Sequence, residues 1–273
     1  MSLYIASIAS GSNGNCYYVG NATEAVLVDA GVSCREIVKR MQRLGLDMKI
    51  VKAIFISHEH SDHIRGLEVL AKKFQLPVYI TPGTLGNSGL KINAEVFSFE
   101  SYQPVAFGDL QVIAFPKQHD AADPYSFVVE HKGIRAGVFT DIGTNCEHVV
   151  NNFKQCHAVF LETNYDEKML EEGGYPFYLK KRIRGDKGHL SNDQALALFK
   201  AHRAPYLSHL LLSHLSQNNN SPALVEELFR KEAGATRVVV ASRYQETGVF
   251  HIHGNPINEP VSAKPVASQL SLF

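Results

Sequence analysis

The chain has 273 residues, of which 45% are hydrophobic, and its 27 lysines and arginines are balanced by 27 aspartates and glutamates. A chain of this length and apolar content can bury a large core, so the composition excludes a disordered protein. Zero formal charge provides no overall positive field and argues against a histone-like or ribosomal-type protein. A nucleic-acid partner would have to be bound by a local basic patch or by metal ions.

Short apolar segments alternate with helical periodicity in the first part of the chain. Three strands joined by Gly and Asn turns are predicted at residues 3–9, 16–19 and 25–28. The turn at residues 10–15, SGSNGN, has no phosphate-binding motif after it, so we expect no catalytic role for it. Ser33 and Glu36 have the spacing of a capping box, and Gly45 marks the end of that helix. An apolar strand at 51–57 then precedes a second helix with the apolar face Ile64, Leu67, Leu70, Ala71 and Phe74.

The rest of the chain mixes strands with helices in the same way. Strands are predicted at 110–116, 125–131, 134–140, 157–162, 209–213 and 237–242. Helices start after Ser191, which forms a capping box with Gln194, and after Ser221, which precedes a proline. Such a mixture predicts layered sheets covered by helices, in one domain over residues 1–253. Residues 254–273 are rich in proline and polar residues and are predicted to be a tail.

The cysteines and the start of the chain indicate a cytoplasmic protein. The four cysteines stand at irregular spacing without a CxxC pair, which fits neither a disulfide scaffold nor a cysteine-rich zinc site. No Lys or Arg precedes Arg35, so we expect no signal peptide. No apolar stretch reaches the roughly 18 residues that span a bilayer, so we expect no membrane partner.

A cluster of metal-ligand types follows the predicted strand at 51–57. Its sequence is HEHSDH, with the ligand types His58, His60, Asp62 and His63. Imidazole nitrogens and carboxylate oxygens suit Zn, Mn or Fe, and alternate residues of an extended segment share one side. A solvated polar loop is the alternative, but four such residues in six positions favour a metal site.

Three further ligand types each follow a predicted strand: His119, Asp141 and His214. Taken singly, each is more often an ordinary loop residue. Together with the HEHSDH cluster they supply five histidines and two aspartates at strand ends. That set is large enough for two metal ions that share a carboxylate.

At this point the sequence resembles the metallo-β-lactamase superfamily. The superfamily's H-x-H-x-D-H motif, downstream His, bridging Asp and final His match His58, His60, Asp62, His63, His119, Asp141 and His214. Its first motif, an Asp after a strand, matches Asp29. The resemblance covers residues 1 to about 253 and implies a four-layer αββα sandwich.

The resemblance also implies a role for each matched residue. One ion would be held by His58, His60 and His119. The other would be held by Asp62, His63 and His214. Asp141 would bridge the ions, and Asp29 would hydrogen-bond ligands without touching metal. Two divalent ions, Zn or Mn, lower the pKa of a water and stabilise the charge that develops in hydrolysis, and their excess positive charge suits a phosphodiester.

A basic and aromatic segment could bind the substrate. Five basic residues stand just before His189: Lys180, Lys181, Arg182, Arg184 and Lys187. Tyr175, Phe177 and Tyr178 precede them, and cations for phosphates beside rings for bases are typical of a surface that binds nucleic-acid strands. The alternative is a solvated charged loop.

His189 and its surroundings resemble the phosphodiesterase branch of the superfamily. There an extra His assists the phosphate or the leaving group; the alternative is a His that hydrogen-bonds at a helix start. Too few positions separate Asp141 from His189 to insert a β-CASP domain. The segments at 10–15, 58–63, 161–166 and 188–192 resemble the compact YycJ/WalJ-like group, which is associated with 5′-to-3′ DNA exonuclease activity. Asn164 and Asp166 could line the site or form a polar turn.

These features predict a dinuclear metal-dependent phosphodiesterase, a DNA exonuclease of replication or repair. Asp62 would position or deprotonate the attacking water, and His189 would donate a proton. A thioester or lactone hydrolase of the glyoxalase II type shares nearly every ligand, so the fold does not decide between them. An RNA-processing nuclease and a metal-holding binding protein are further alternatives.

The last five residues resemble a peptide that binds the bacterial sliding clamp. They are QLSLF, and the possible contacts are Gln269, Leu270, Leu272 and Phe273. Leu272 and Phe273 would be apolar anchors, and Gln269 would make polar contacts at the rim. Apolar residues at the end of a tail either dock on a partner or pack on their own domain. We expect the clamp as a partner, with packing on the chain's own domain as the alternative.

Overall fold

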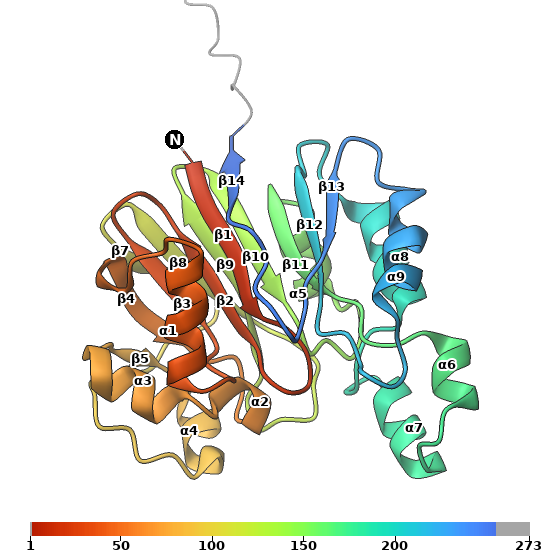
Figure 1. Ribbon diagram of the computed structural model, residues 1–273, viewed down its shortest axis with the longest axis horizontal. Helices are drawn as coiled ribbons and strands as arrows, with labels where there is room; N and C mark the ends of the chain where they lie inside the picture. The colour runs from red at the N-terminus through yellow and green to blue at the C-terminus, as the bar shows by residue number, and fades with distance from the viewer. Residues whose placement is uncertain (1, 255–273) are drawn as a thin grey trace, which may run out of the picture.

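The computed structural model describes residues 2–254, and in it two seven-stranded sheets pack face to face (Figure 1). The first sheet has the order β14-β1-β2-β3-β4-β5-β6 and the second β13-β12-β11-β10-β9-β8-β7. The strands of the first sheet are β1 (Ser2–Ala9), β2 (Cys16–Gly20), β3 (Ala25–Val28), β4 (Val51–Phe55), β5 (Val78–Tyr79), β6 (Val96–Phe97) and β14 (Phe250–His253). Those of the second are β7 (Val105–Phe107), β8 (Leu110–Pro116), β9 (Tyr125–His131), β10 (Ile134–Phe139), β11 (Ala158–Glu162), β12 (His209–Ser213) and β13 (Arg237–Val240).

Helices cover the outer faces of both sheets (Figure 1). The helices are α1 (Cys34–Arg43), α2 (Ser61–Ile64), α3 (Leu67–Phe74), α4 (Pro82–Ser88), α5 (Glu147–Phe153), α6 (Glu167–Glu172), α7 (Phe177–Arg184), α8 (Asn192–His202) and α9 (Pro222–Arg230), with a short 3₁₀ turn at Met48–Ile50. Helices α1 and α3 pack on the first sheet, and α5, α8 and α9 pack on the second. The αββα sandwich implied by the sequence is confirmed.

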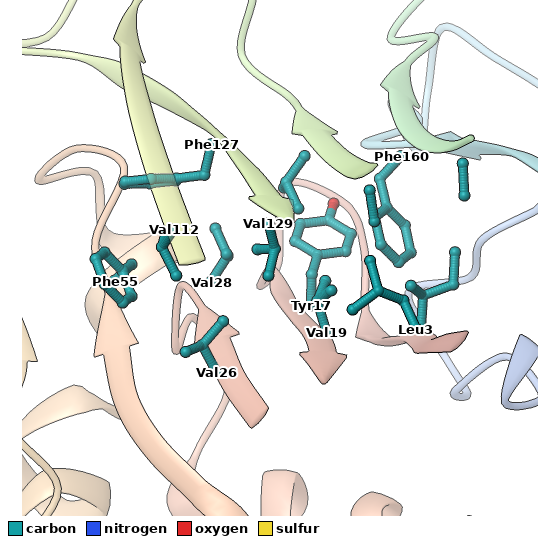
Figure 2. Close-up of a cluster of buried hydrophobic side chains, with 14 of the residues drawn as sticks. Leu3, Tyr17, Val19, Val26, Val28, Phe55, Val112, Phe127, Val129 and Phe160 are labelled. Carbon is teal, nitrogen blue, oxygen red and sulfur yellow. The ribbon is translucent and has the colours of Figure 1, made fainter. Parts of the chain in front are cut away.

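The main core lies between the two sheets (Figure 2). Tyr17 of β2 contacts Phe160 of β11 with ring centroids 4.9 Å apart, and Phe55 of β4 meets Phe127 of β9 at 5.6 Å. All four rings are fully buried. Each is worth roughly 1.5–3 kcal/mol of burial, so the facing sheets form a rigid base for the site at their edge.

Most predicted elements are present, and one differs in a way that matters for the site. The Ser191–Gln194 capping box is formed, and the Ser33 hydroxyl accepts from the Glu36 N–H at the start of α1. The second predicted helix is wrong as a single element, because it is divided into α2 and α3. A Cβ at Gly66 would lie 2.0 Å from the Val32 carbonyl oxygen, so this close backbone contact occurs where the helix is interrupted.

The predicted basic segment is helical in the structure. Residues 177–184 form the exposed helix α7 and not a loop. With α6 it projects from the body of the molecule (Figure 1). The predicted tail, with Gln269, Leu270, Leu272 and Phe273, lies outside the described residues. Within residues 2–254, no helix has the length and apolar character needed to cross a bilayer.

Candidate metal centre

The predicted ligands meet where parallel strands end. Pairs β3–β4, β10–β11 and β11–β12 are parallel, so their carboxyl ends lie at one edge of each sheet. Asp29 and His214 directly follow β3 and β12, and Asp141 stands two residues after the end of β10. Their φ angles are +63° for Asp29, +54° for Asp141 and +56° for His214. Positive φ is uncommon for residues other than glycine, and such strain concentrates at functional sites. The backbone bends sharply at each of these three positions as it leaves the sheet.

Three imidazoles form one group of possible ligands. His58 and His60 come from the segment after β4, and His119 comes from the segment after β8. Nδ1 of His60 lies 3.2 Å from Nε2 of His58 and 3.3 Å from Nε2 of His119. Burial lowers the pKa of His119 to about 3 and holds that of His58 well below its usual value, so both rings present neutral nitrogens that can bind a cation.

A second group lies beside the first, and Asp141 stands between them. His63 and His214 direct Nε2 toward Asp62 Oδ2, at 3.6 and 3.4 Å. Asp141 Oδ2 lies 3.2 Å from His63 Nε2, while its Oδ1 lies 3.8 Å from His119 Nε2 of the first group. Asp141 is therefore placed to share its two oxygens between two ions.

The ring nitrogens that face away from the centre are held by hydrogen bonds. Asp29 Oδ2 lies 2.7 Å from Nδ1 of His63, and the Ser57 hydroxyl lies 2.9 Å from Asp29 Oδ2 and 2.9 Å from Nδ1 of His58. Nδ1 of His119 lies 3.0 Å from the Gly188 carbonyl oxygen. Such contacts orient each ring so that its other nitrogen can bind metal. Asp29 thus contacts the candidate ligand His63, and its role beside a metal ion stays a prediction.

Glu162, at the end of β11, is a functional residue that the sequence interpretation missed. Its Oε1 lies 2.9 Å from Nδ1 of His214 and 2.8 Å from Nδ1 of His189. Its Oε2 accepts from the Ile142 and Leu190 N–H groups, so each carboxylate oxygen makes two hydrogen-bonding contacts. Burial raises the pKa of Glu162, but His189 and His214 outweigh burial and lower it to about 2. The available signal was a carboxylate closing an apolar strand, in the same LETNYD segment as Asn164 and Asp166.

The donor set fits two divalent cations. Asp141 Oδ2 and His214 Nε2 are buried and lack a hydrogen-bond partner among residues 2–254, although such groups are almost always satisfied in folded proteins. Burial lowers the pKa of His214, but Asp141, Asp62 and Glu162 outweigh it and raise that pKa to about 10. A buried site that favours a proton this strongly needs positive charge, which a metal ion supplies in its place.

The loop at residues 10–15 reaches the metal centre, although the sequence indicated no role for it. Nδ2 of Asn15 lies 3.3 Å from Asp62 Oδ2 and 3.2 Å from His63 Nε2. The Ser10 hydroxyl accepts the His214 backbone N–H at 2.8 Å. This loop therefore supports ligands on both sheets.

A pocket of about 350 Å³ opens onto the ligands. His189, Asn164 and Arg182 line it together with Asp62 and ligands of both groups. The side chain of Asn164 donates to the His214 carbonyl oxygen at 2.9 Å, which confirms its place at the site.

Other predicted residues are used differently. Asp166 caps α6 through the Met169 N–H and is not among the residues that line the pocket, which favours the polar turn that the sequence also allowed. Arg182 pairs with Asp120 at 2.5 Å, whereas Arg184 pairs with Glu171 and holds α7 to α6. Of the predicted basic residues, Arg182 thus lines the pocket, and Arg184 holds helices α6 and α7 together.

Comparisons with known proteins agree with this centre. A family model described as "Beta-lactamase superfamily domain" matches residues 24–214. The chain belongs to the metallo-β-lactamase superfamily. Its histidine and aspartate clusters are those typical of the superfamily's dinuclear site.

This superfamily member has relatives along most of its length. It is 35% identical to "Exodeoxyribonuclease YycJ" of Bacillus anthracis, over 97% of this chain and 100% of that one. It is 33% identical to "Exodeoxyribonuclease WalJ" of Streptococcus pneumoniae, over 78% of this chain and 81% of that one. The superfamily member is thus a metal-dependent hydrolase related to proteins named exodeoxyribonucleases.

Solved structures show the same fold at low identity. Zn(2+)-bound PqqB of Methylobacterium extorquens superposes with a TM-score of 0.70 at 14% identity, over 89% of this chain and 99% of that one. The short form of human tRNase Z superposes with a TM-score of 0.60 at 17% identity, over 90% and 98%. These likenesses concern the metallo-β-lactamase fold alone.

Proposed function

We propose that residues 1–253 form the catalytic domain of a dinuclear metal-dependent phosphodiesterase, a 5′-to-3′ DNA exonuclease of replication or repair. The observation that carries the proposal is the lining of the pocket. Candidate ligands of both groups line it together with His189 and Arg182. A neutral ester or thioester has no use for a cationic rim, whereas a phosphodiester does. The names of the YycJ and WalJ relatives support DNA as the substrate.

The two groups of candidate ligands correspond to two metal ions. His58, His60 and His119 would hold one ion. Asp62, His63 and His214 would hold the other, with Asp141 shared. When bound, two divalent ions such as Zn or Mn lower the pKa of a nearby water and neutralise charge that develops on the phosphate.

The other pocket residues move protons and orient the substrate. Glu162 holds Nδ1 of His189, so Nε2 is the ring atom available to donate to the scissile phosphate or the departing oxygen. The Asp62 carboxylate lines the pocket and can orient a water by hydrogen bonding. The Arg182 side chain is exposed and Asp120 is half-buried, so Arg182 can exchange this partner for a phosphate at modest cost.

Helix α7 provides a surface for the strand beyond the pocket. Phe177 and Tyr178 are 81% and 72% exposed, which is unusual for large rings unless they meet a partner. Lys180, Lys181 and Lys187 stand on or just after the same helix. Rings that stack on bases beside cations that contact phosphates are typical of proteins that bind single strands.

Digestion of labelled nucleic acids tests the proposal. The protein would be loaded with Zn, Mn or Mg and given 5′- or 3′-labelled single- and double-stranded DNA and RNA. We expect metal-dependent release of mononucleotides from the 5′ end of DNA. Preferred cleavage of RNA would indicate an RNA-processing nuclease, and cleavage of a thioester or lactone without any nuclease activity would contradict the proposal.

A further inference from the structure

A second pocket of about 380 Å³ lies next to the metal centre. It is formed by the segments that follow β12 and β13, at the same sheet edge as the ligands. Ser216 lines both pockets, and Ser10, which lines the second one, holds the backbone of the ligand His214. The two spaces are therefore neighbours that share a wall.

The second pocket is suited to a ligand with an anionic group. Arg243 lines it and donates to the Leu215 carbonyl oxygen at 2.5 Å and to Gln217 Oε1 at 3.2 Å. Within residues 2–254 its guanidinium makes no ion pair, and no lining residue is acidic. A half-buried guanidinium that is held by neutral oxygens retains its positive charge for an incoming phosphate.

The remaining walls are suited to a nucleoside. Tyr244 lines the pocket and is 73% exposed, so its ring can stack on a base. Val240 and Leu215 provide apolar surface, and Gln217 and Gln245 supply amide groups among the lining residues. An aromatic ring, a few amides and one cation make a site for a nucleotide better than for a purely apolar molecule.

The segment at residues 242–245, which lines this pocket, is anchored to helix α1. Arg40 donates to the Tyr244 carbonyl oxygen at 3.1 Å, and Arg43 pairs with Glu246 at 2.6 Å. The Ser10 N–H also donates to the Ser242 carbonyl oxygen at 3.2 Å. Residues 242–245, which line the pocket, are therefore held in place by contacts with α1 and with Ser10.

We propose that the second pocket holds the terminal nucleotide of the strand, with its phosphate on Arg243 and its base on Tyr244. The identity of the ligand rests on the proposed nuclease function. The volume lies at the lower end for ligand sites, which suits one nucleotide and not two. The next phosphodiester then falls at the neighbouring metal centre, and this explains removal of nucleotides from an end.

The direct test is calorimetric titration of the zinc-loaded full-length protein with deoxyadenosine 5′-monophosphate. The variants are Arg243→Gln and Tyr244→Ala, with Arg230→Gln as the control, because Arg230 is an exposed arginine of α9 that pairs with Glu226. Loss of a charged contact or of a stacking ring is expected to weaken binding about tenfold or more. Tyr244→Phe keeps the ring and should bind like the unaltered protein, as should Arg230→Gln.

Several outcomes decide between this inference and the proposed function. If Arg243→Gln binds the nucleotide as tightly as Arg230→Gln does, the inference is wrong even when DNA is degraded. If nucleotide binding depends on Arg243 but no variant or parent degrades DNA, the pocket stands and the nuclease proposal fails. If Arg243→Gln lowers the melting temperature, the nucleotide affinities of Tyr244→Ala and Tyr244→Phe test the inference instead, because the exposed Tyr244 ring is not packed in the core. Equal affinities would contradict the inference.

On labelled DNA, Arg243→Gln should raise KM about tenfold with a smaller change in kcat, and Arg230→Gln should change neither. Equal KM values for the two variants would overturn the inference.

Discussion

The carboxylate of Glu162 holds the imidazole of His189 from behind, with Oε1 2.8 Å from Nδ1. The same oxygen lies 2.9 Å from Nδ1 of His214, so one buried carboxylate orients both a proposed metal ligand and the proposed proton donor. If His214 binds metal and His189 transfers a proton as proposed, a single side chain at the end of β11 couples the two.

Replacing Glu162 with Gln should weaken metal binding and slow hydrolysis together. The amide keeps the shape of the side chain but loses the charge that balances two imidazoles, and loss of such supporting groups costs about 10- to 100-fold in metal affinity or activity. Competition with a chelator measures zinc affinity, and bis(p-nitrophenyl) phosphate measures turnover. Unchanged values for both would show that Glu162 is merely a buried carboxylate satisfied by its neighbours.

His189→Ala should keep both ions and lower turnover by about 10² to 10⁴, the usual contribution of a positioned acid or base. Metal content by elemental analysis and single-turnover rates on DNA provide the readouts. Loss of an ion from this variant would instead make His189 a ligand, which its position within 4.8 Å of Asp141, Glu162 and His214 ligand atoms allows geometrically. Asp141→Ala is the contrasting variant, and it should lose both metal and activity.

Lys180→Ala combined with Lys181→Ala should weaken DNA binding and flatten its dependence on salt. Each phosphate contact that is removed lowers the slope of log K against log salt by about 0.7 for a single strand. Lys200→Ala with Lys231→Ala is the matched control, because these exposed lysines lie on or next to α8 and α9 and pair with acidic neighbours. Fluorescence anisotropy at several salt concentrations measures both slopes, and identical slopes would remove α7 from the binding surface.

Gly31→Ala should destabilise the protein and impair the metal centre. A Cβ there would lie 1.7 Å from the Asp62 carbonyl oxygen, so the backbone of the HEHSDH segment has to shift. Overpacking of this kind costs about 1–3 kcal/mol or more. Gly86→Ala is the control, since Gly86 lies in α4 and no atom of the described part of the chain lies within 4 Å of its Cβ position. This substitution should be neutral or slightly stabilising. Thermal melts would settle the matter: equal melting temperatures would exclude the steric role of Gly31.

We propose that the chain's last five residues bind the sliding clamp. A variant that ends at Ser268 lacks Gln269, Leu270, Leu272 and Phe273 and should therefore no longer retain the cognate clamp in a pull-down. Its hydrolysis of bis(p-nitrophenyl) phosphate should be unchanged, because the metal ligands all precede residue 215. Retention of the clamp by both forms would contradict the proposal and leave the metal centre unaffected.

The sequence by itself predicted the layered fold, which the structure confirms, and the candidate ligands, which the structure brings together. The HEHSDH segment is recognisable because four residues of metal-ligand type, His58, His60, Asp62 and His63, stand within six positions after an apolar strand. Asp29, Asp141 and His214 are recognisable because each ends a strand, and in the structure each of the three has a positive φ angle. These are local signals, and local sequence carries them.

Only the tertiary structure decided the contacts made between distant segments. Glu162 becomes an orienting residue because β11 lies between β10 and β12, which brings its carboxylate beside His214. Asn15 reaches Asp62 because two loops of the first sheet converge, and the second predicted helix is divided where Gly66 passes close to Val32. Such contacts depend on strand order and close packing across long sequence separations, which periodicity and spacing do not encode.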